Sequence, residues 1–437
     1  MLTTLKNAFK IKEIRNKLLF TLVMLVVIRI GSQLPTPGVN GELFAQWFES
    51  HTSGAFSFFD AITGGSFTSM AILALGINPY ITSSIIIQLL TIAIPKLEEM
   101  QRDGEDGRKK IVAITRYVTV VLALVQATAM AVGFGRQGYL VEFNALSIIT
   151  AVAALTAGSA FLMWVGERIT EKGIGNGISI VLVINIISRL PEDLSNLFDM
   201  FVFGKPYATA ILAAVIIFAI IVAMVVLVVL LNSATRKIPV QYAKKVQGRK
   251  MVGGQTSNIP LKVNTAGVIP VIFAQSIMQF PILICSFIGY QGTGVWGEIL
   301  KGLNSDNWCR ISQPIYSIGL LVYIVLIIFF AYFYTSITFN PLMIADNMKK
   351  QGGFIPGIRP GKPTSDYLNR VLNYIIFIGA VGLMIVSVIP FFFNGVFGAN
   401  VSFGGTSLII IVSVVLETMK QIESQMLVRN YKGFLED

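Results

Sequence analysis

The sequence predicts an all-α polytopic membrane protein that crosses the bilayer about ten times, in two five-helix halves of opposite orientation. Three observations lead to this fold class. More than half of the 437 residues are apolar (54%), and only 13% are charged, about half the charged share of a soluble domain. The apolar residues form continuous runs of about 20, the length that a helix needs to cross a bilayer. Lysine and arginine alternate strongly between successive loops.

The ten predicted spans are apolar segments that approach or exceed this length. They lie at 18–34, 71–94, 117–134, 145–165, 178–190, 209–231, 264–288, 314–334, 371–393 and 405–426. The fifth is short, and the tenth carries Glu417, Lys420 and Glu423 near its end, so it is expected to continue into water. A strand barrel is disfavoured because barrel strands are ~10-residue segments of alternating polarity. We expect the first span to stay in the membrane, since it has no small-residue cleavage site after it.

The distribution of Lys and Arg among the loops predicts on which side of the membrane each loop lies. Of the 34 Lys and Arg residues, 28 lie in the N-terminus, in four alternate loops (95–116, 166–177, 232–263 and 335–370) and in the tail from Lys420. The other side holds Arg29, Arg136, Arg189, Lys205, Lys301 and Arg310. The positive-inside rule therefore places both termini in the cytoplasm. The net charge of +11 is thus explained by topology without a nucleic-acid partner.

An odd number of spans in each half inverts one half relative to the other. Five spans precede the outer loop at 191–208 and five follow it. The predicted units are residues 1–190 and 209–437, related as in an inverted repeat.

The segment at 56–70 is partly apolar, too short to span, and interrupted by Gly64 and Gly65. It lies on the predicted outer side, directly before the second span. Two interpretations are open from the residues alone. It is either a re-entrant segment folded into the protein or an amphipathic helix at the membrane interface.

Spans 71–94 and 264–288 each carry a polar stripe beside apolar side chains at helical spacing. The polar members are Ser84, Gln88, Gln275, Ser276 and Gln279, and the apolar ones are Ile81, Ile85 and Ile272. Side-chain amides within a span need partners in other helices or in water. The stripes therefore indicate either ordinary helix contacts or a seam that can separate, and Pro270 and Pro281 would loosen the second helix.

Glycines and prolines mark three connections. Residues 173–180 read GIGNGISI, which predicts a turn that caps a helix; a phosphate site is disfavoured because no strand precedes and no P-loop lysine follows. Residues 232–263 hold seven basic and no acidic residues, and their alternation with a turn at Gln247 and Gly248 predicts a hairpin. Residues 351–363 predict a rigid loop that presents Arg359. These basic loops fit docking on RNA phosphates or an acidic protein face, or simply the positive-inside rule.

Catalytic chemistry has no evident residues. His51 is the only histidine, and Cys285 and Cys309 have no metal or redox spacing. We therefore expect no metal, no cofactor and no enzymatic activity. Apart from Arg29, no ionisable residue lies near the middle of a predicted span. Arg29 lies toward the outer end of the first span, where its side chain can extend to the membrane interface. A small-solute transporter would need charges near mid-span, and a membrane enzyme would need convergent catalytic groups. A channel and a transporter both remain open on this evidence.

Six stretches resemble the SecY family of bacterial protein-conducting channel subunits. They occur in family order and read LGINPY through QLL (75–90), GERITEKGIGNGISI (166–180), QYAKK with QGRK (241–250), LKVNTAGVIP (261–270), FIPGIRPG (354–361) and FGGTSL (403–408). Together they are highly specific and cover nearly the whole chain. The resemblance implies an hourglass around a central pore that passes unfolded polypeptide across the bacterial inner membrane and releases apolar segments sideways into lipid.

The resemblance also assigns roles to residues. It implies an apolar pore ring of Ile81, Ile85, Leu182, Ile272 and Ile410, in which Leu182 departs from the expected isoleucine but keeps a similar volume. It implies a plug made of Phe56, Ser57, Phe58, Phe59, Asp60, Ala61, Ile62, Thr63, Gly64, Gly65, Ser66 and Phe67. A lateral gate is implied between spans 71–94 and 264–288, with Gln88, Gln275, Ser276 and Gln279 as candidates.

Partners follow from the same resemblance. Loops 232–263 and 335–370 would dock the ribosome or the SecA ATPase through Lys244, Lys245, Arg249, Lys250 and Arg359, so nucleic acid would be met only as ribosomal RNA. SecE would clamp the two halves, and SecG would lie at the periphery. Translocating polypeptides and membrane lipids complete the expected partners.

Overall fold

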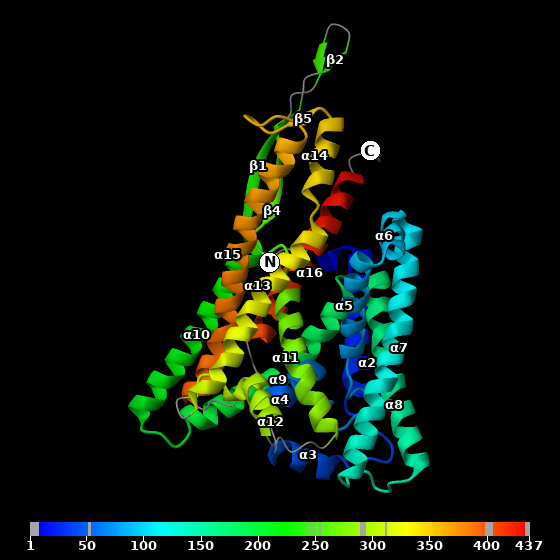
Figure 1. Cartoon of the computed structure of the whole chain (residues 1–437), viewed down its shortest axis with the longest axis vertical. Coiled ribbons are helices and arrows are strands. Elements are labelled where there is room, and N and C mark those ends of the chain that lie inside the picture. The colour runs from blue at the N-terminus through cyan, green and yellow to red at the C-terminus, as the bar shows by residue number, and fades with distance from the viewer. Residues whose placement is uncertain are drawn as a thin grey trace.

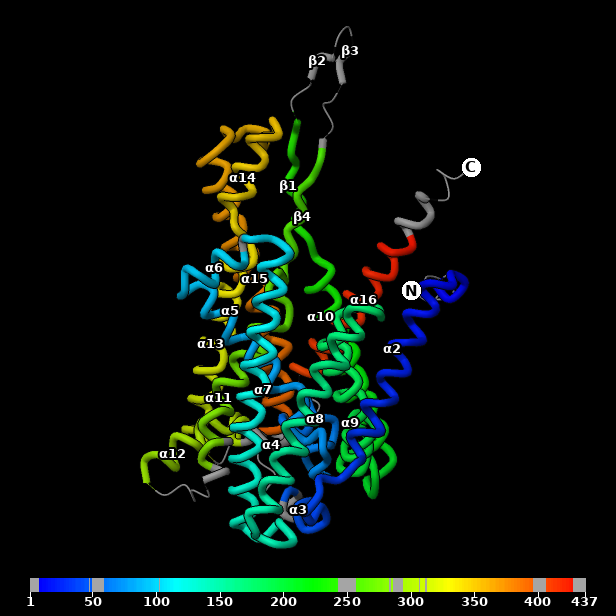
Figure 2. The backbone as a smooth tube through the Cα atoms, turned by 90° about the vertical axis from the view of Figure 1, so that its right-hand side faces the viewer, coloured from blue at the N-terminus to red at the C-terminus, as the bar shows by residue number. Residues whose placement is uncertain are grey.

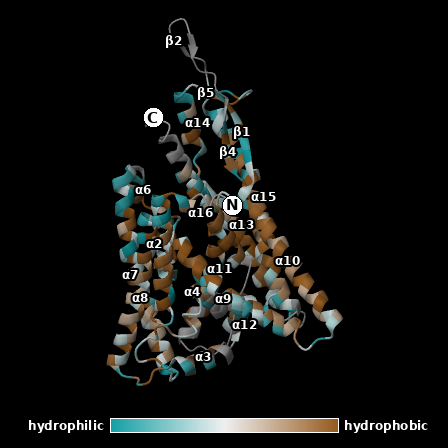
Figure 3. Ribbon diagram, turned by 180° about the vertical axis from the view of Figure 1, so that it is seen from behind, coloured by the Kyte–Doolittle hydropathy of each residue, from teal (hydrophilic) through white to brown (hydrophobic). Residues whose placement is uncertain are grey.

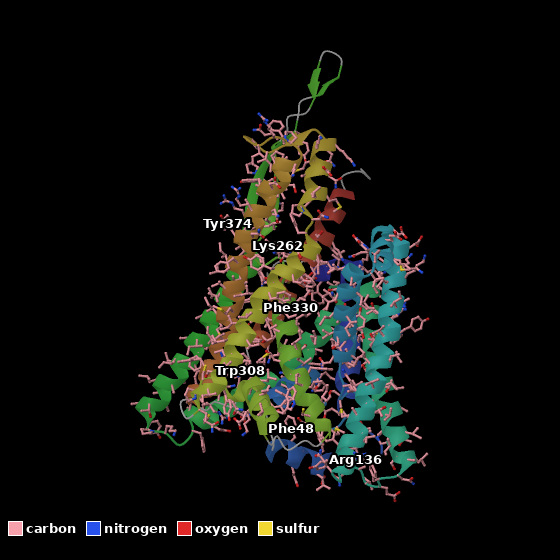
Figure 4. The ribbon with its side chains drawn as sticks, viewed as in Figure 1. Phe48, Arg136, Lys262, Trp308, Phe330 and Tyr374 are labelled. Atoms are coloured by element: carbon pink, nitrogen blue, oxygen red, sulfur yellow. The ribbon has the colours of Figure 1, made fainter. Side chains whose placement is uncertain are left out.

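The computed structural model describes residues 8–50, 54–242, 245–247, 250–252, 256–288, 294–310, 313–397 and 405–432. Long helices run along the molecule, and a β-hairpin projects from one end (Figure 1). We call this the hairpin end; the helices α3 and α12 lie at the opposite end (Figure 2). Lys262 and Phe330 lie in the middle part of the molecule, and Arg136 lies at the end opposite the hairpin (Figure 4).

Each of the ten predicted spans overlaps one long helix of the described chain. The helices of the first half are α2 (Lys12–Gly31), α3 (Gly41–Ser50), α4 (Gly54–Thr63), α5 (Asn78–Ala93), α6 (Pro95–Arg102), α7 (Gly104–Arg136), α8 (Ala145–Lys172) and α9 (Gly177–Phe201). Those of the second half are α10 (Tyr207–Ser233), α11 (Ile269–Ile288), α12 (Gly294–Leu303), α13 (Ile318–Thr338), α14 (Pro341–Lys350), α15 (Lys362–Phe397) and α16 (Gly405–Lys432), with short 3₁₀ helices η1 (Ser305–Asn307) and η2 (Pro314–Ser317).

Hydropathy separates the helices into two groups. Among the described residues, five segments are long and apolar enough to cross a membrane by themselves, and they contain α7, α8, α10, α13 with α14, and α15. The bent pair of α5 and α6, with an angle of 107° between its parts, makes a possible sixth. The apolar surface covers the outward faces of α10 and its neighbours, whereas polar residues gather at the hairpin end (Figure 3). α2, α9 and α16 carry charged residues along with their apolar segments.

Several helix ends differ from the predicted span ends, and two of these differences bear on the site. The second helix begins at Asn78 rather than at 71, because Gly76 adopts a positive φ of 59° and Pro79 occupies the first turn of α5. The fifth helix does not end at 190, since α9 continues through Pro191 to Phe201. Most of the predicted 191–208 loop is therefore helical, and Lys205 lies in the short turn between α9 and α10.

Helices contact one another within residues 1–201, within residues 207–432 and between these two parts of the chain. In the first half, α8 packs against α2, α7 and α9, and α5 packs against α7. In the second half, α13 packs between α11 and α15, and α16 packs on α10 and α15. The halves meet where α16 contacts α9 and where α11 contacts α7. Two such seams on opposite sides leave an interior between the halves.

The hairpin prediction for 232–263 is confirmed. Strands β1 (Thr235–Tyr242) and β4 (Thr256–Lys262) pair antiparallel, and β2 (Lys245–Gln247) pairs antiparallel with β3 (Lys250–Val252). The sequence did not predict that β5 (Gly353–Phe354) pairs with β1. This third strand joins the two large loops into one unit, whose core of Ile238, Val240 and Leu261 packs against α15 residues such as Leu368.

Candidate pore site

A ring of apolar side chains separates two cavities in the interior. The hairpin-end cavity (about 500 Å³) lies between α5, α7, α8, α9, α11 and α16. The plug-side cavity (about 490 Å³) lies between α5, α7, α11 and α13 and reaches α4. The five predicted ring residues, Ile81, Ile85, Leu182, Ile272 and Ile410, line both cavities. Phe273 also lines both cavities. We call the five predicted residues, which lie between the two cavities, the partition.

Four helices, from both halves, supply the partition. Ile81 and Ile85 come from α5, Leu182 from α9, Ile272 from α11 and Ile410 from α16. Leu182, Ile272 and Ile410 are buried, and the five pack in or against shared apolar clusters. A constriction with no polar atom offers water no hydrogen bond, so it resists wetting and ion passage. Since its members sit on separate helices, small helix movements widen it.

The segment at 56–67 is folded into the protein and reaches the plug-side cavity. Its helix α4 packs against α9 and also contacts α11 and η1. Residues 60–64 are buried, and Phe59 and Ile62 line the plug-side cavity. The side chains of Phe56, Ser57 and Phe58 lie outside the described residues. This placement favours the re-entrant interpretation over an interfacial helix.

Charged and polar contacts tie this segment to neighbouring helices. The Asp60 carboxylate, which is fully buried (0% exposed), forms an ion pair with the Arg189 guanidinium at 2.6 Å. The backbone amide of Thr68 donates to the same carboxylate at 2.9 Å. Arg29 donates to the Gly64 carbonyl at 3.1 Å. Arg29 thus reaches into the protein, which corrects the expectation that it would snorkel to the interface.

Gly64 fits because it lacks a side chain. A Cβ at this position would lie 2.9 Å from Asn185 Cα, and its φ of +70° disfavours other residues. Ser188 donates weakly to its carbonyl at 3.4 Å. The close approach explains how the Gly64 carbonyl reaches both Arg29 and α9.

The charge state of Asp60 depends on its partner. Burial raises the pKa of the Asp60 carboxyl, and the nearby Arg189 guanidinium and the Thr68 amide oppose that rise. Removing Arg189 would leave an uncompensated acid in the interior. A buried pair of this kind is costly to break from one side, by about 3–5 kcal/mol.

The predicted gate residues do not share one contact. Gln88 lines the hairpin-end cavity, is exposed, and donates to Ser84 on its own helix. Ser276 and Gln279 line the plug-side cavity. Gln275 is 4% exposed and lines neither cavity, and its Oε1 has no hydrogen-bond partner within the described chain. Across this side of the molecule, α11 packs on α7, and the plug-side cavity opens between α5 and α11.

The cap predicted at 173–180 is confirmed. Asn176 is the N-cap of α9, and its side chain accepts from the amides of Ile178 and Ser179. A Cβ on Gly177 would lie 1.9 Å from the Gly166 carbonyl oxygen, so this glycine permits close packing of α9 on α8. The motif thereby fixes where α9 starts and where it presents Leu182 and Arg189.

A polar rim surrounds the mouth of the hairpin-end cavity. Arg116 of α7 donates to Glu167 of α8 at 2.7 Å, and Glu171 lies one turn further along α8. Two of the predicted docking residues, Lys244 and Arg249, lie outside the described residues, and the side chains of Lys245 and Lys250 are also not described. Arg359 is exposed on its loop, where its carbonyl accepts from Thr364 at 2.8 Å.

Sequence reasoning missed the residues that hold the 56–67 segment. Arg189 was counted only as one of the six basic residues on the outer side, and Arg29 was expected to snorkel. One signal was available, because Asp60 is the only acidic residue in an otherwise apolar and small-residue segment. A lone acid in such a segment predicts a basic partner nearby. Among the described residues, no cluster of His, Cys, Asp and Glu could hold a metal.

An all-α polytopic fold with an apolar constriction between two cavities defines a gated membrane channel. The family model for SecY matches residues 71–419, and the chain belongs to this family. It is 44% identical to the protein translocase subunit SecY of Streptomyces galbus and 42% identical to that of Bacillus subtilis (strain 168), over the full length of each pair.

Solved structures show the same fold. A structure of a protein conducting channel matches with a TM-score of 0.61 and 20% identity, covering 94% of this chain and 92% of the other. Sec61 in a canine ribosome–channel complex matches with a TM-score of 0.59 and 18% identity, covering 94% and 92%. A SecY structure whose plug domain is described as stabilising the closed state and maintaining a membrane seal matches with a TM-score of 0.61 and 20% identity, covering 94% and 92%.

Proposed function

We propose that the chain is the channel subunit of a bacterial protein translocase, which moves unfolded polypeptide across the inner membrane. The observation that carries this proposal is the shared lining of the two cavities by Ile81, Ile85, Leu182, Ile272 and Ile410. A narrow apolar collar blocks ions when empty. Branched side chains on separate helices can move apart for an extended chain and close around it.

The segment at 56–67 acts as the plug in this proposal. It lies against the ring from the plug side, so a polypeptide arriving through the hairpin-end cavity would have to displace it. In one of the similar solved structures, a SecY protein, the plug domain is described as maintaining a membrane seal. That description supports the same role for this segment. The ring and the plug would then form two seals in series.

Sideways release of apolar segments would use the side where α11 packs on α7. The plug-side cavity there is lined by α5 residues such as Ile86 and Leu89 and by the exposed α11 residues Ile277 and Phe280. An apolar segment in the pore could exchange these contacts for lipid at little cost. The predicted polar residues Ser276 and Gln279 line the same cavity, which supports a role for them in this gate, with Gln88 at its hairpin end.

The hairpin end would receive the partners. The sheet β4–β1–β5 joins loops 232–263 and 335–370, so Arg359 and the basic hairpin form one platform. The ribosome or SecA would dock there, SecE would clamp the halves, and SecG would lie at the periphery. We propose no catalytic role for the chain itself; translation, SecA or the membrane potential would supply the energy.

Photocrosslinking tests the channel directly. A photoreactive phenylalanine analogue at Leu182 or Ile410 should crosslink to a polypeptide stalled during translocation, because both side chains face the constriction. The same analogue at Phe218, which is 70% exposed on the outer face of α10, is the matched control and should crosslink to lipid. If Phe218 and Leu182 react equally with the stalled chain, the assigned pore is wrong. If the protein were a small-solute transporter, none of the three positions would crosslink to the stalled polypeptide.

A further inference from the structure

We propose that Arg189 and Arg29 are positioning residues that tie the plug to the first half of the protein. The two halves could then part at the α7–α11 seam while the plug stays seated. This inference rests on the proposed function. It separates two events, the sideways release of apolar segments and the opening of the pore through the ring.

The polar contacts that leave the plug end on the first half, within the part of the chain that the structure describes. Asp60 pairs with Arg189 of α9 at 2.6 Å. The Gly64 carbonyl accepts from Arg29 of α2 at 3.1 Å and from Ser188 of α9 at 3.4 Å. Arg189 is itself held by Glu192 of α9 at 2.7 Å. The hydrogen bonds to the Gly64 carbonyl are directional and weaken steeply when their geometry is disturbed. The ion pair of Asp60 holds a buried charge that is costly to leave without its partner.

The plug also contacts the second half at α11 and η1, and its side chains that face the shared interior there are apolar. Ile62 belongs to the same buried cluster as Ile272 of α11 and Ile410 of α16. Phe59 lines the cavity that these residues share. Apolar contacts are non-directional, and their loss leaves no buried charge behind. When the halves separate, the plug therefore follows the half to which its charged group is bound.

The pore ring is coupled to the same tether through α9. Leu182 and Arg189 are seven residues apart on this helix, so they lie on one face, two turns apart. Between them, Asn185 and Ser188 contact Gly64. A polypeptide that pushes Leu182 outward moves the helix that holds the plug. Passage through the ring therefore strains the tether, whereas separation at the α7–α11 seam does not.

The test compares three readouts on reconstituted complexes of the full chain with its translocase partners. They are resting ion conductance, translocation of a soluble secretory protein, and integration of a single transmembrane segment. Arg189→Ala and Asp60→Asn should each raise the frequency of resting openings at least tenfold and speed translocation of a substrate with a weak signal sequence. Integration should change less than twofold.

Two controls address charge and folding. Arg136→Ala removes an exposed arginine at the C-terminal end of α7. This variant should change none of the three readouts. Arg189→Lys keeps the positive charge near Asp60 and should restore most of the seal, which a merely structural defect in α9 would not allow. The double exchange of Asp60→Arg with Arg189→Asp reverses the pair and should leak less than either single variant.

The outcomes separate the inference from the function on which it rests. Integration that rises in proportion to translocation would overturn the inference, since the plug would then be bound equally to both halves. Unchanged resting conductance in Arg189→Ala would also overturn it. If the unmodified complex neither translocates nor integrates its substrates, the proposed function itself fails.

Discussion

At the scale of single residues, the seal depends on apolarity more than on the particular side chain. The five ring positions meet between two cavities although their helices are far apart in the chain. Leu182 replaces an expected isoleucine and still packs in the central cluster with Ile272 and Ile410. This agrees with a collar that excludes water by its surface chemistry.

The first prediction follows from that chemistry. Leu182→Ser places a hydroxyl in the constriction, where it can hold water, so ion leakage through the resting channel should rise several-fold. Leu182→Ile preserves volume and apolarity and should match the unmodified channel. Planar-bilayer recordings measure both. Equal leakage from the two variants would show that Leu182 does not face the constriction.

The second prediction concerns the close packing of α8 and α9. Gly177→Ala puts a methyl group 1.9 Å from the Gly166 carbonyl oxygen, so the helices must separate. Overpacking of this kind costs about 1–3 kcal/mol. The variant should lower the thermal midpoint in detergent by several degrees. Gly302→Ala on α12, which has no atom within 4 Å of the added methyl, should not, and an equal loss in both variants would contradict this account.

The five ring residues line both cavities, and their role as a seal stays a prediction. The residue-level predictions were incomplete where a contact joins distant segments. Nothing local to Asp60 indicates that Arg189, 129 positions later, is its partner. Arg29 illustrates the same limit, because its expected snorkelling was argued from its span alone, whereas its partner Gly64 lies in another segment.

At the scale of elements, hydrophobic runs located the helices well and their ends poorly. The start of α5 follows from the positive φ of Gly76 and from Pro79, which the apolar run of 71–94 does not reveal by hydropathy alone. Gly76 also packs against Thr63, which lies outside that run. The continuation of α9 beyond Pro191 was hidden by a residue that usually ends helices. The hairpin was predictable from alternation, but its third strand, β5, comes from a loop that is about 90 residues away.

The third prediction tests the platform formed by these strands. Arg359→Glu reverses an exposed charge at the hairpin end and should weaken SecA or ribosome binding about tenfold at low salt, with a smaller effect at high salt. Resting conductance should stay unchanged. Arg310→Glu, on the other predicted side of the membrane, is the matched control. Binding measured on reconstituted vesicles checks the result, and equal losses in both variants would argue against a local docking surface.

At the scale of the whole molecule, the distribution of basic loops agrees with the arrangement of the helices. The α6 region, the hairpin and α14 lie at one end, and α3 and α12 lie at the other (Figures 1 and 2). The loops richest in Lys and Arg are therefore together, as the alternation of spans requires. The inverted relation of the two halves stays a prediction from counting spans. The residues that line the two interior cavities come from both parts of the chain, so no single segment of the sequence indicates which residues meet there.

The fourth prediction addresses orientation. In a background without native cysteines, Lys205→Cys and Lys362→Cys place exposed thiols at opposite ends of the bundle. A membrane-impermeant maleimide added outside intact cells should label position 205 and leave position 362 unlabelled until the membrane is opened. Labelling in the reverse order would invert the topology that the 28 cytoplasmic basic residues predict.

The most direct test of the central claim is single-channel conductance in planar bilayers, comparing the purified complex with a form that lacks residues 57–67. We expect the intact channel to be nearly silent and the deletion to open frequently, because the ring alone would then separate the two cavities. If neither form conducts ions, even with a polypeptide engaged, the cavities do not belong to one pore and the channel account is wrong.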